Sequence, residues 1–163
     1  MGEAGKPTDW ITMKIDPEIF EELGVRDPEE TKREMAITKK TRQVTKELKT
    51  DPDNVDLQIE LATLMIDGAN YEEAIKNLKA IRNKAPKSAR VHKLLGTAYV
   101  LFNHEEEGML ELNRACELDP TDAENFFNLG GLYLLRDMYQ NAMEAFEKVI
   151  ELDPTDTTAY ANL

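Results

Sequence analysis

Residues 123–156 read AENFFNLGGLYLLRDMYQNAMEAFEKVIELDPTD, and the architecture of the chain can be inferred from this stretch. Its last five letters, LDPTD, also occur at 118–122, which is 34 residues earlier. Prolines recur along the chain at the same interval, at Pro52, Pro86, Pro120 and Pro154. A fixed period of this length is typical of a repeat protein, so the units have to be aligned before any helix is assigned.

The alignment starts from the residues that follow each proline. Two positions after each proline stands a residue whose side-chain oxygen can accept from the unpaired N–H groups of a first helical turn. These residues are Asn54, Ser88, Asp122 and Asp156. Starting each unit after them gives three full units, 55–88, 89–122 and 123–156, and a fourth, 157–163, that stops after seven residues.

Large and small apolar residues alternate within the units at spacings of three and four, which predicts two helices of about 13 residues in each unit. The breaks between the helices fall at DGAN (67–70), FNHE (102–105) and RDMY (136–139). Proline then ends the second helix, because it cannot donate to the helical ladder. Small residues let the paired helices approach closely, at Ala62, Gly96 and Gly130 on the first helices and at Ala74, Gly108 and Ala142 on the second.

The third unit carries Phe126, Leu129, Gly130, Tyr133, Ala142, Phe146 and Pro154. This pattern resembles the tetratricopeptide repeat signature, with phenylalanine in place of tryptophan. The second unit departs from the signature at His92 and Gly108, and the first at Gln58, Ala62 and Met65. The resemblance covers residues 55–163. It implies an all-α fold, an α-solenoid in which antiparallel helix pairs form a right-handed superhelix.

The N-terminal third of the chain has no such period. Residues 1–27, with Trp10 in an apolar stretch, are expected to form a partly ordered extension, or alternatively to dock on the repeats. Asp27 and Pro28 predict the start of a helix that runs to about Lys49. Residues 28–54 are therefore interpreted as a degenerate half-repeat that caps the first unit.

Composition excludes several classes of function. The 163 residues include 20 Lys and Arg and 32 Asp and Glu, and the net charge of −12 argues against nucleic acid as a partner. No stretch has the length or composition of a signal peptide or a transmembrane helix, so we expect no membrane insertion and a cytoplasmic location. The single cysteine, Cys116, excludes an internal disulfide.

No pattern of reactive residues indicates an enzyme. The two histidines, His92 and His104, stand with no cysteine or carboxylate at a spacing typical of a metal site or a nucleophile–base pair. Cys116 is interpreted as a packing residue, since no nearby basic cluster or CxxC motif activates it. We therefore expect no catalytic residues, no metal and no cofactor.

The resemblance implies that the concave face of the array is lined mainly by first helices. The second, fifth, sixth, ninth and twelfth places of each unit are expected to face this groove: Asp56, Ile59, Glu60, Thr63 and Ile66, then Arg90, Lys93, Leu94, Thr97 and Val100, then Glu124, Phe127, Asn128, Gly131 and Leu134. The candidate peptide-binding residues are Ile59, Thr63, Ile66, Arg90, Lys93, Thr97, Val100, Phe127, Asn128 and Leu134. A peptide with a carboxylate near Arg90 and Lys93 and an apolar side chain near Phe127 and Leu134 would be complementary.

The resemblance also allows a narrower test. Chaperone-binding members of the family hold a C-terminal carboxylate with Lys and Asn on one first helix, Asn on the next, and Lys and Arg on the third. The matching positions here are Lys93, Thr97, Asn128, Thr158 and Asn162, of which only Lys93 and Asn128 agree. A carboxylate-clamp co-chaperone is therefore not expected.

Three functions stay open at this point. The first is an adaptor that binds a peptide or helix of a partner protein in the groove, and the second is a scaffold that self-associates by end-to-end stacking. The third is the regulatory array of a larger enzyme, secretion or assembly machine. The unfinished fourth unit favours a longer array, because stopping at Leu163 is expected to leave the outer faces of Phe146, Val149 and Ile150 incompletely covered.

Overall fold

The computed structural model describes residues 27–163, and every regular element in this part of the chain is an α-helix. The expected extension at residues 1–27 lies outside the described residues except for Asp27. The chain divides into two compact units, residues 1–39 and residues 40–163. None of the helices between residues 27 and 163 is long and apolar enough to cross a lipid bilayer.

The first described helix, α2, runs from Pro28 to Thr50. It begins where Asp27 and Pro28 predict a start: Asp27 Oδ1 accepts a hydrogen bond of 2.9 Å from the backbone N–H of Glu29. Two glutamates in the first turn and a lysine in the last suit the helix dipole. The predicted helix is therefore confirmed, while its role as a capping half-repeat stays a prediction.

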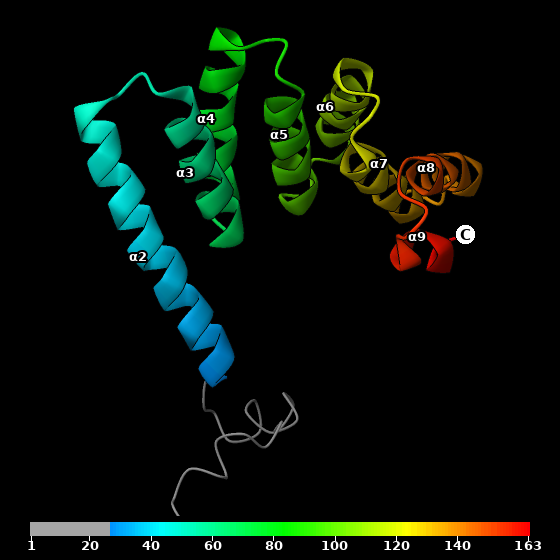
Figure 1. Ribbon diagram of the computed structural model, residues 1–163, viewed down its shortest axis with the longest axis horizontal. Helices are drawn as coiled ribbons and strands as arrows, with labels where there is room; N and C mark the ends of the chain where they lie inside the picture. Colours follow the sequence, from blue (N-terminus) through cyan, green and yellow to red (C-terminus); the bar gives the residue numbers. More distant parts are fainter. Residues whose placement is uncertain (1–26) are drawn as a thin grey trace, which may run out of the picture. The chain divides into compact units, whose positions relative to one another are not determined.

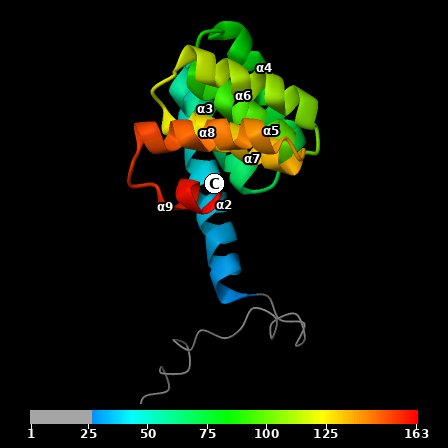
Figure 2. The same ribbon diagram turned by 90° about the vertical axis from the view of Figure 1, so that its right-hand side faces the viewer.

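Three helix pairs follow α2 along the chain. Figure 1 shows their arrangement. They are α3 (Val55–Asp67) with α4 (Tyr71–Lys84), α5 (Ala89–Leu101) with α6 (Glu105–Leu118), and α7 (Ala123–Leu135) with α8 (Tyr139–Leu152), after which comes the short α9 (Thr157–Ala161). Each of these helices packs against the next along the chain, and α5 also touches α3 and α7. Figure 2 shows α8 running across the view beside α7. This arrangement is the expected all-α solenoid.

The four predicted helix caps are all present. Asn54, Ser88, Asp122 and Asp156 each accept a hydrogen bond from a backbone N–H of the following first turn. Asp156 accepts two, from the N–H groups of Thr158 and Ala159, at 2.9 and 3.0 Å. Each first helix therefore starts where the sequence period places it.

The repeated LDPTD contains a second hydrogen-bonded element that the sequence analysis did not anticipate. Asp119 Oδ1 accepts from both the N–H and the hydroxyl of Thr121, at 3.1 and 2.7 Å, and Asp153 and Thr155 repeat this arrangement. The hydroxyl hydrogen bond, followed by the backbone one, lowers the pKa of both aspartates below their ordinary value. The threonine thus closes the turn around the proline.

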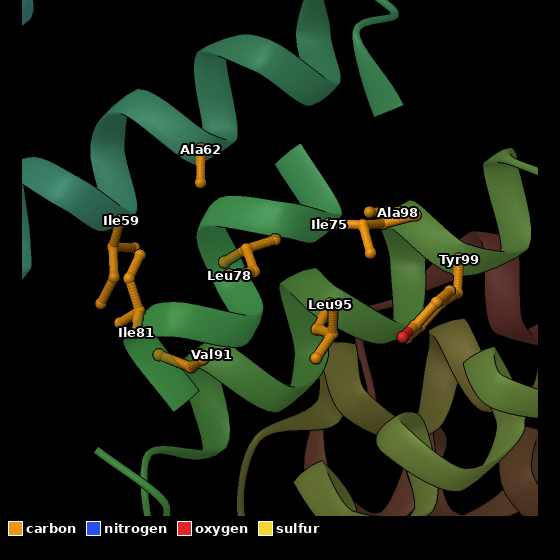
Figure 3. Packing of buried hydrophobic residues seen from close by; sticks show 9 residues of the cluster. All are labelled: Ile59, Ala62, Ile75, Leu78, Ile81, Val91, Leu95, Ala98 and Tyr99. Carbon is orange, nitrogen blue, oxygen red and sulfur yellow. The ribbon is translucent and has the colours of Figure 1, made fainter. Parts of the chain in front are cut away.

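The core is a chain of apolar clusters between successive pairs, of which Figure 3 shows the first. There, buried side chains of α3, α4 and α5 meet, including Ile59, Leu78 and Leu95. The small residues act as expected: a Cβ added to Gly96 would lie 2.7 Å from Leu112 Cγ, and one added to Gly108 would lie 2.6 Å from Val100 Cγ2. The close approach of α5 to α6 therefore requires glycine on both helices.

The turns inside the pairs share one unusual backbone conformation. Ala69, Asn103 and Asp137, again 34 residues apart, have positive φ angles of 59°, 62° and 56°. The one glycine in these turns, Gly68, has φ −89° and is not the left-handed residue. The sequence thus located the turns correctly, but the residue that bears the strained backbone is the next one along the chain.

The C-terminal end corrects one expectation. Phe146 and Val149 were expected to be incompletely covered, yet their side chains are 0% and 1% exposed. Ala159 of α9 packs in the same cluster, and Phe127 and Leu134 of α7 pack against it. Because one helical turn and α7 suffice to cover these two side chains, the expectation of an uncovered end was wrong for Phe146 and Val149. Ile150 is half-buried.

Candidate functional site

The first helices α3, α5 and α7 are successive neighbours. Their face that carries the positions expected to line the groove is called the first-helix surface below. A depression of about 330 Å³ lies on it, lined by Thr63, Ala89, Arg90, Lys93, Leu94, Asp119, Asp122 and Glu124. Three of the ten candidate residues, Thr63, Arg90 and Lys93, are among these. The depression therefore brings together candidates from two units, and it adds Asp119 and Asp122 from the end of the second unit and Glu124 from the start of the third.

Lys93 is already engaged within the protein. Its ammonium donates to Asp122 Oδ2 at 3.0 Å and to Glu124 Oε2 at 2.5 Å, and its side chain is only 14% exposed. Burial by itself would lower the pKa of Lys93, but the hydrogen bonds to Glu124 and Asp122 outweigh it and raise the pKa above its ordinary value. Lys93 thus links α5 to the start of α7, and a ligand carboxylate would have to displace these partners.

Arg90 differs from Lys93 in its surroundings. It is exposed, it lines the same depression, and no ion pair involves it among the described residues. A guanidinium keeps its charge and can bind two acceptors at once. Arg90 is therefore the basic side chain of the depression that is open to a ligand.

The candidate residues on α7 form an apolar sector. Phe127 and Leu134 are half-buried and pack on the cluster around Phe146, with the rings of Phe127 and Phe146 edge to face at 5.7 Å between centroids. Asn128 is half-buried beside them. Gly131, one turn after Phe127, faces open space, because an added Cβ would meet no atom within 4 Å. The sector thus combines the aromatic ring of Phe127 with a helical position, Gly131, that has no side chain and faces open space.

The remaining candidates contribute less exposed surface. Ile59 is buried in the core and is not open to a ligand, while Ile66 and Val100 are partly buried against the cores. The hydroxyls of Thr63 and Thr97 donate to the carbonyls four residues earlier, at 2.9 Å each. These positions shape the surface, while Arg90 and the α7 sector present its open groups.

Two exposed leucines on these helices were missed by the sequence analysis. Leu101 and Leu135 are 47% and 65% exposed, and each is the last residue of its first helix. Leu135 lies four residues after Gly131, so both share one helix face. Each leucine lies four residues after the ninth place of its unit, which is Thr97 or Gly131. The helical i, i+4 spacing would therefore have predicted that it shares the same helix face.

His92 also has a partner that the sequence spacing did not show. Its Nδ1 lies 2.6 Å from Glu111 Oε2 and its Nε2 lies 3.0 Å from the carbonyl of Pro86. Arg82 of α4 donates to the other oxygen of Glu111. The three side chains link α4, α5 and α6. His92 occupies the position at which the repeat signature has an aromatic residue. Because both ring nitrogens of His92 and both carboxylate oxygens of Glu111 have partners within the protein, we interpret the group as a structural joint.

Cys116 packs in the apolar cluster with Leu112, Leu129 and Leu132. It is buried, and burial is the main cause that raises its pKa to about 11, so the thiol is protonated at neutral pH. No cluster of three or more metal-binding side chains occurs in the part of the chain that the structure describes.

A tetratricopeptide repeat model matches residues 42–98, and a second model of the same repeat matches residues 123–156. Together the matches cover more than half of the chain. The chain belongs to the tetratricopeptide repeat family. Members of this family are generally non-catalytic modules that interact with proteins or peptides, and this array is a protein-interaction module.

Related proteins agree with this placement. The "Hsp70-Hsp90 organizing protein" of Triticum aestivum is 28% identical over 101 residues, which are 62% of this chain and only 17% of that protein. A crystal structure of MamA has a TM-score of 0.70 at 28% identity and covers 84% of this chain and 81% of its own. The structure "MamA 41-end from Desulfovibrio magneticus RS-1" has a TM-score of 0.67 at 26% identity, with 88% and 79% covered.

A further solved structure shares the fold alone. It is titled "First TPR of Spaghetti (RPAP3) bound to HSP90 peptide SRMEEVD", with a TM-score of 0.64 at 18% identity, and covers 67% of this tetratricopeptide repeat chain and 86% of its own.

Proposed function

We propose that this chain is a non-catalytic adaptor that binds a peptide or helix of a partner protein on the first-helix surface. The observation that carries the proposal is the depression at Arg90 in a chain of the tetratricopeptide repeat family. Its lining reaches Glu124, which lies one turn before Phe127 of the apolar sector on α7. A cation beside apolar side chains offers both orientation and binding energy to a peptide.

A carboxylate clamp is not part of the proposal. The lysine that such a clamp would use, Lys93, is held by Asp122 and Glu124, and the matching positions on α9 and just after it are Thr158 and Asn162. The name of the wheat relative refers to Hsp70 and Hsp90, but this chain spans 17% of its length. We therefore do not carry its partners over to this protein.

The test uses the full-length chain as bait, with quantitative mass spectrometry of the captured proteins. Arg90→Glu removes the open cation, and Phe127→Ala removes the aromatic ring. Lys76→Glu is the matched control, because Lys76 is exposed on the second helix α4 and the charge change equals that at Arg90. Lys93 is not a suitable probe, since changing it would leave two carboxylates without their shared cation.

We expect both groove variants to lose most of the specifically captured partner, while Lys76→Glu keeps it. Circular dichroism of each variant checks that helicity is unchanged, which matters for Phe127 because its ring packs on Phe146. Partner capture at the wild-type level by both groove variants would refute the proposed function.

A further inference from the structure

Gly131 is the feature of the first-helix surface that packing does not explain. Gly96, Gly108 and Gly130 each lie so close to a facing helix that an added Cβ would come within 3.0 Å or less of a neighbouring atom. At Gly131, also inside a helix, the same Cβ would meet nothing within 4 Å. Alanine is the better helix former, and the packing of the folded chain does not require glycine at this position.

The surroundings of Gly131 are apolar. Phe127 stands one turn before it and Leu135 one turn after it, and Leu134 lies beside them. Leu135 is 65% exposed although it is a large apolar residue. These four residues, Phe127, Gly131, Leu134 and Leu135, are called the Gly131 seat. A missing side chain between two large ones leaves room for the side chain of a ligand.

Acidic side chains outnumber basic ones in the depression, because Asp119, Asp122 and Glu124 line it together with Arg90 and Lys93. The ammonium of Lys93 is shared by the carboxylates of Asp122 and Glu124, so these three side chains together have a net negative charge. Asp119 lines the same depression, and its lowered pKa, caused first by the Thr121 hydroxyl, keeps it ionised. The Glu124 side chain is 66% exposed and can accept a further cation.

The helix α7 sets the distance between the acidic side chain of Glu124 and the Gly131 seat. Glu124 and Gly131 are seven residues apart on α7, which is two turns, so they share one face at a distance of about 10 Å. An extended peptide covers about 10 Å in three residues, and a helical peptide in seven.

From these observations we infer that the ligand is a segment of a partner protein with a large apolar side chain in the Gly131 seat and a basic side chain at Glu124 and Asp122. This inference rests on the proposed function and deepens it by naming the chemistry of the partner. The basic and apolar residues of the segment are three apart if the segment is extended and seven apart if it is helical. The net charge of −12 favours the approach of such a segment.

A peptide selection on the intact protein tests the inference. A phage-displayed library of random dodecapeptides is selected on the wild-type chain, with the double variant Arg90→Glu/Phe127→Ala as the counter-target. An enriched sequence is then synthesised with blocked ends and a fluorescent label, and its affinity is measured by fluorescence anisotropy. Blocked ends exclude recognition of a terminal carboxylate.

Two variants probe the two halves of the site. Gly131→Met fills the seat with a side chain that has room and favours the helix, so a loss of binding without a loss of thermal stability is specific to the seat. Glu124→Lys reverses the charge at an exposed position. We expect each to weaken binding at least about tenfold, and we expect Glu124→Lys to prefer the peptide in which the basic residue is replaced by Glu. Lys76→Glu is expected to bind as the wild type does.

The outcomes separate the inference from the proposed function. Enriched peptides that lose binding in the double variant, but lack the basic and apolar pair or bind Gly131→Met normally, would overturn the inference and leave the proposed function standing. If no peptide is enriched on the wild type over the counter-target, both are overturned.

Discussion

Replacing two helical glycines by alanine should change stability in opposite directions. Gly96 lies on α5 against α6, where an added Cβ would sit 2.7 Å from Cγ and 3.0 Å from the backbone nitrogen of Leu112. Leu112 is buried and its backbone belongs to the facing helix, so it has little room to move. Gly131 on α7 has nothing within 4 Å of the same added atom. The two sites thus differ in packing but not in secondary structure.

The magnitude follows from two contributions to the free energy of unfolding. Alanine in place of glycine inside a helix stabilises by about 0.5–1 kcal/mol. Gly131→Ala should show this gain in full. At Gly96 the gain is offset by overpacking, which costs about 1–3 kcal/mol in a closely packed core. We therefore expect Gly131→Ala to be more stable than Gly96→Ala by about 1–3 kcal/mol.

Urea unfolding followed by far-UV circular dichroism measures both variants and the wild type under the same conditions. The midpoint should rise for Gly131→Ala and fall for Gly96→Ala, with equal slopes for the three proteins. Equal stabilisation at both sites would show that α5 and α6 are not packed as closely as described. A loss at Gly131 would show that this position contacts another part of the chain.

Two more predictions concern the turns. Ala69→Gly should raise the free energy of unfolding by about 0.5–1 kcal/mol in the same urea assay, because Ala69 has φ 59° and glycine adopts this conformation without steric cost; an unchanged midpoint would contradict the assignment of this turn. The lowered pKa of Asp119 stabilises the fold above its unfolded pKa of about 3.9, and this contribution is lost as the pH falls through the lower folded pKa. An NMR titration of the carboxyl carbon should show the pKa of Asp119 returning toward its ordinary value in Thr121→Val, whereas an unchanged titration would exclude the threonine as the cause.

Much of the fold could be predicted from the sequence because its signals are local. The caps Asn54, Ser88, Asp122 and Asp156 act on N–H groups two or three residues away, so spacing alone locates the start of each first helix. The close approach at Gly96 and Gly108 could likewise be inferred, since small residues at fixed places of two paired helices indicate that the two backbones lie near each other. The residue with the positive φ angle in each turn could not be predicted as well. Glycine is the residue usually expected to adopt this conformation, but in the first turn Ala69 adopts it and Gly68 does not.

The candidate site could be predicted only in part. Places on a helix face follow from periodicity, which explains why Thr63, Arg90 and Lys93 do line the depression. Periodicity does not predict whether a side chain on that face is exposed to a ligand. Ile59 lies on the same expected face and is buried in the core, because the packing of the neighbouring helices decides its exposure.

The period of 34, the family, the helix starts and the positions where paired helices touch all follow from the amino-acid order alone, since each depends on residues close in the chain or on a repeated pattern. Which groups are open to a ligand depends instead on how the units pack. Lys93 meets Asp122 and Glu124 from 29 and 31 residues away, and His92 meets Glu111 from 19. Such pairs form where separate helices pack together, within one unit for His92 and Glu111 and between two units for Lys93 and Glu124, and no local spacing encodes them.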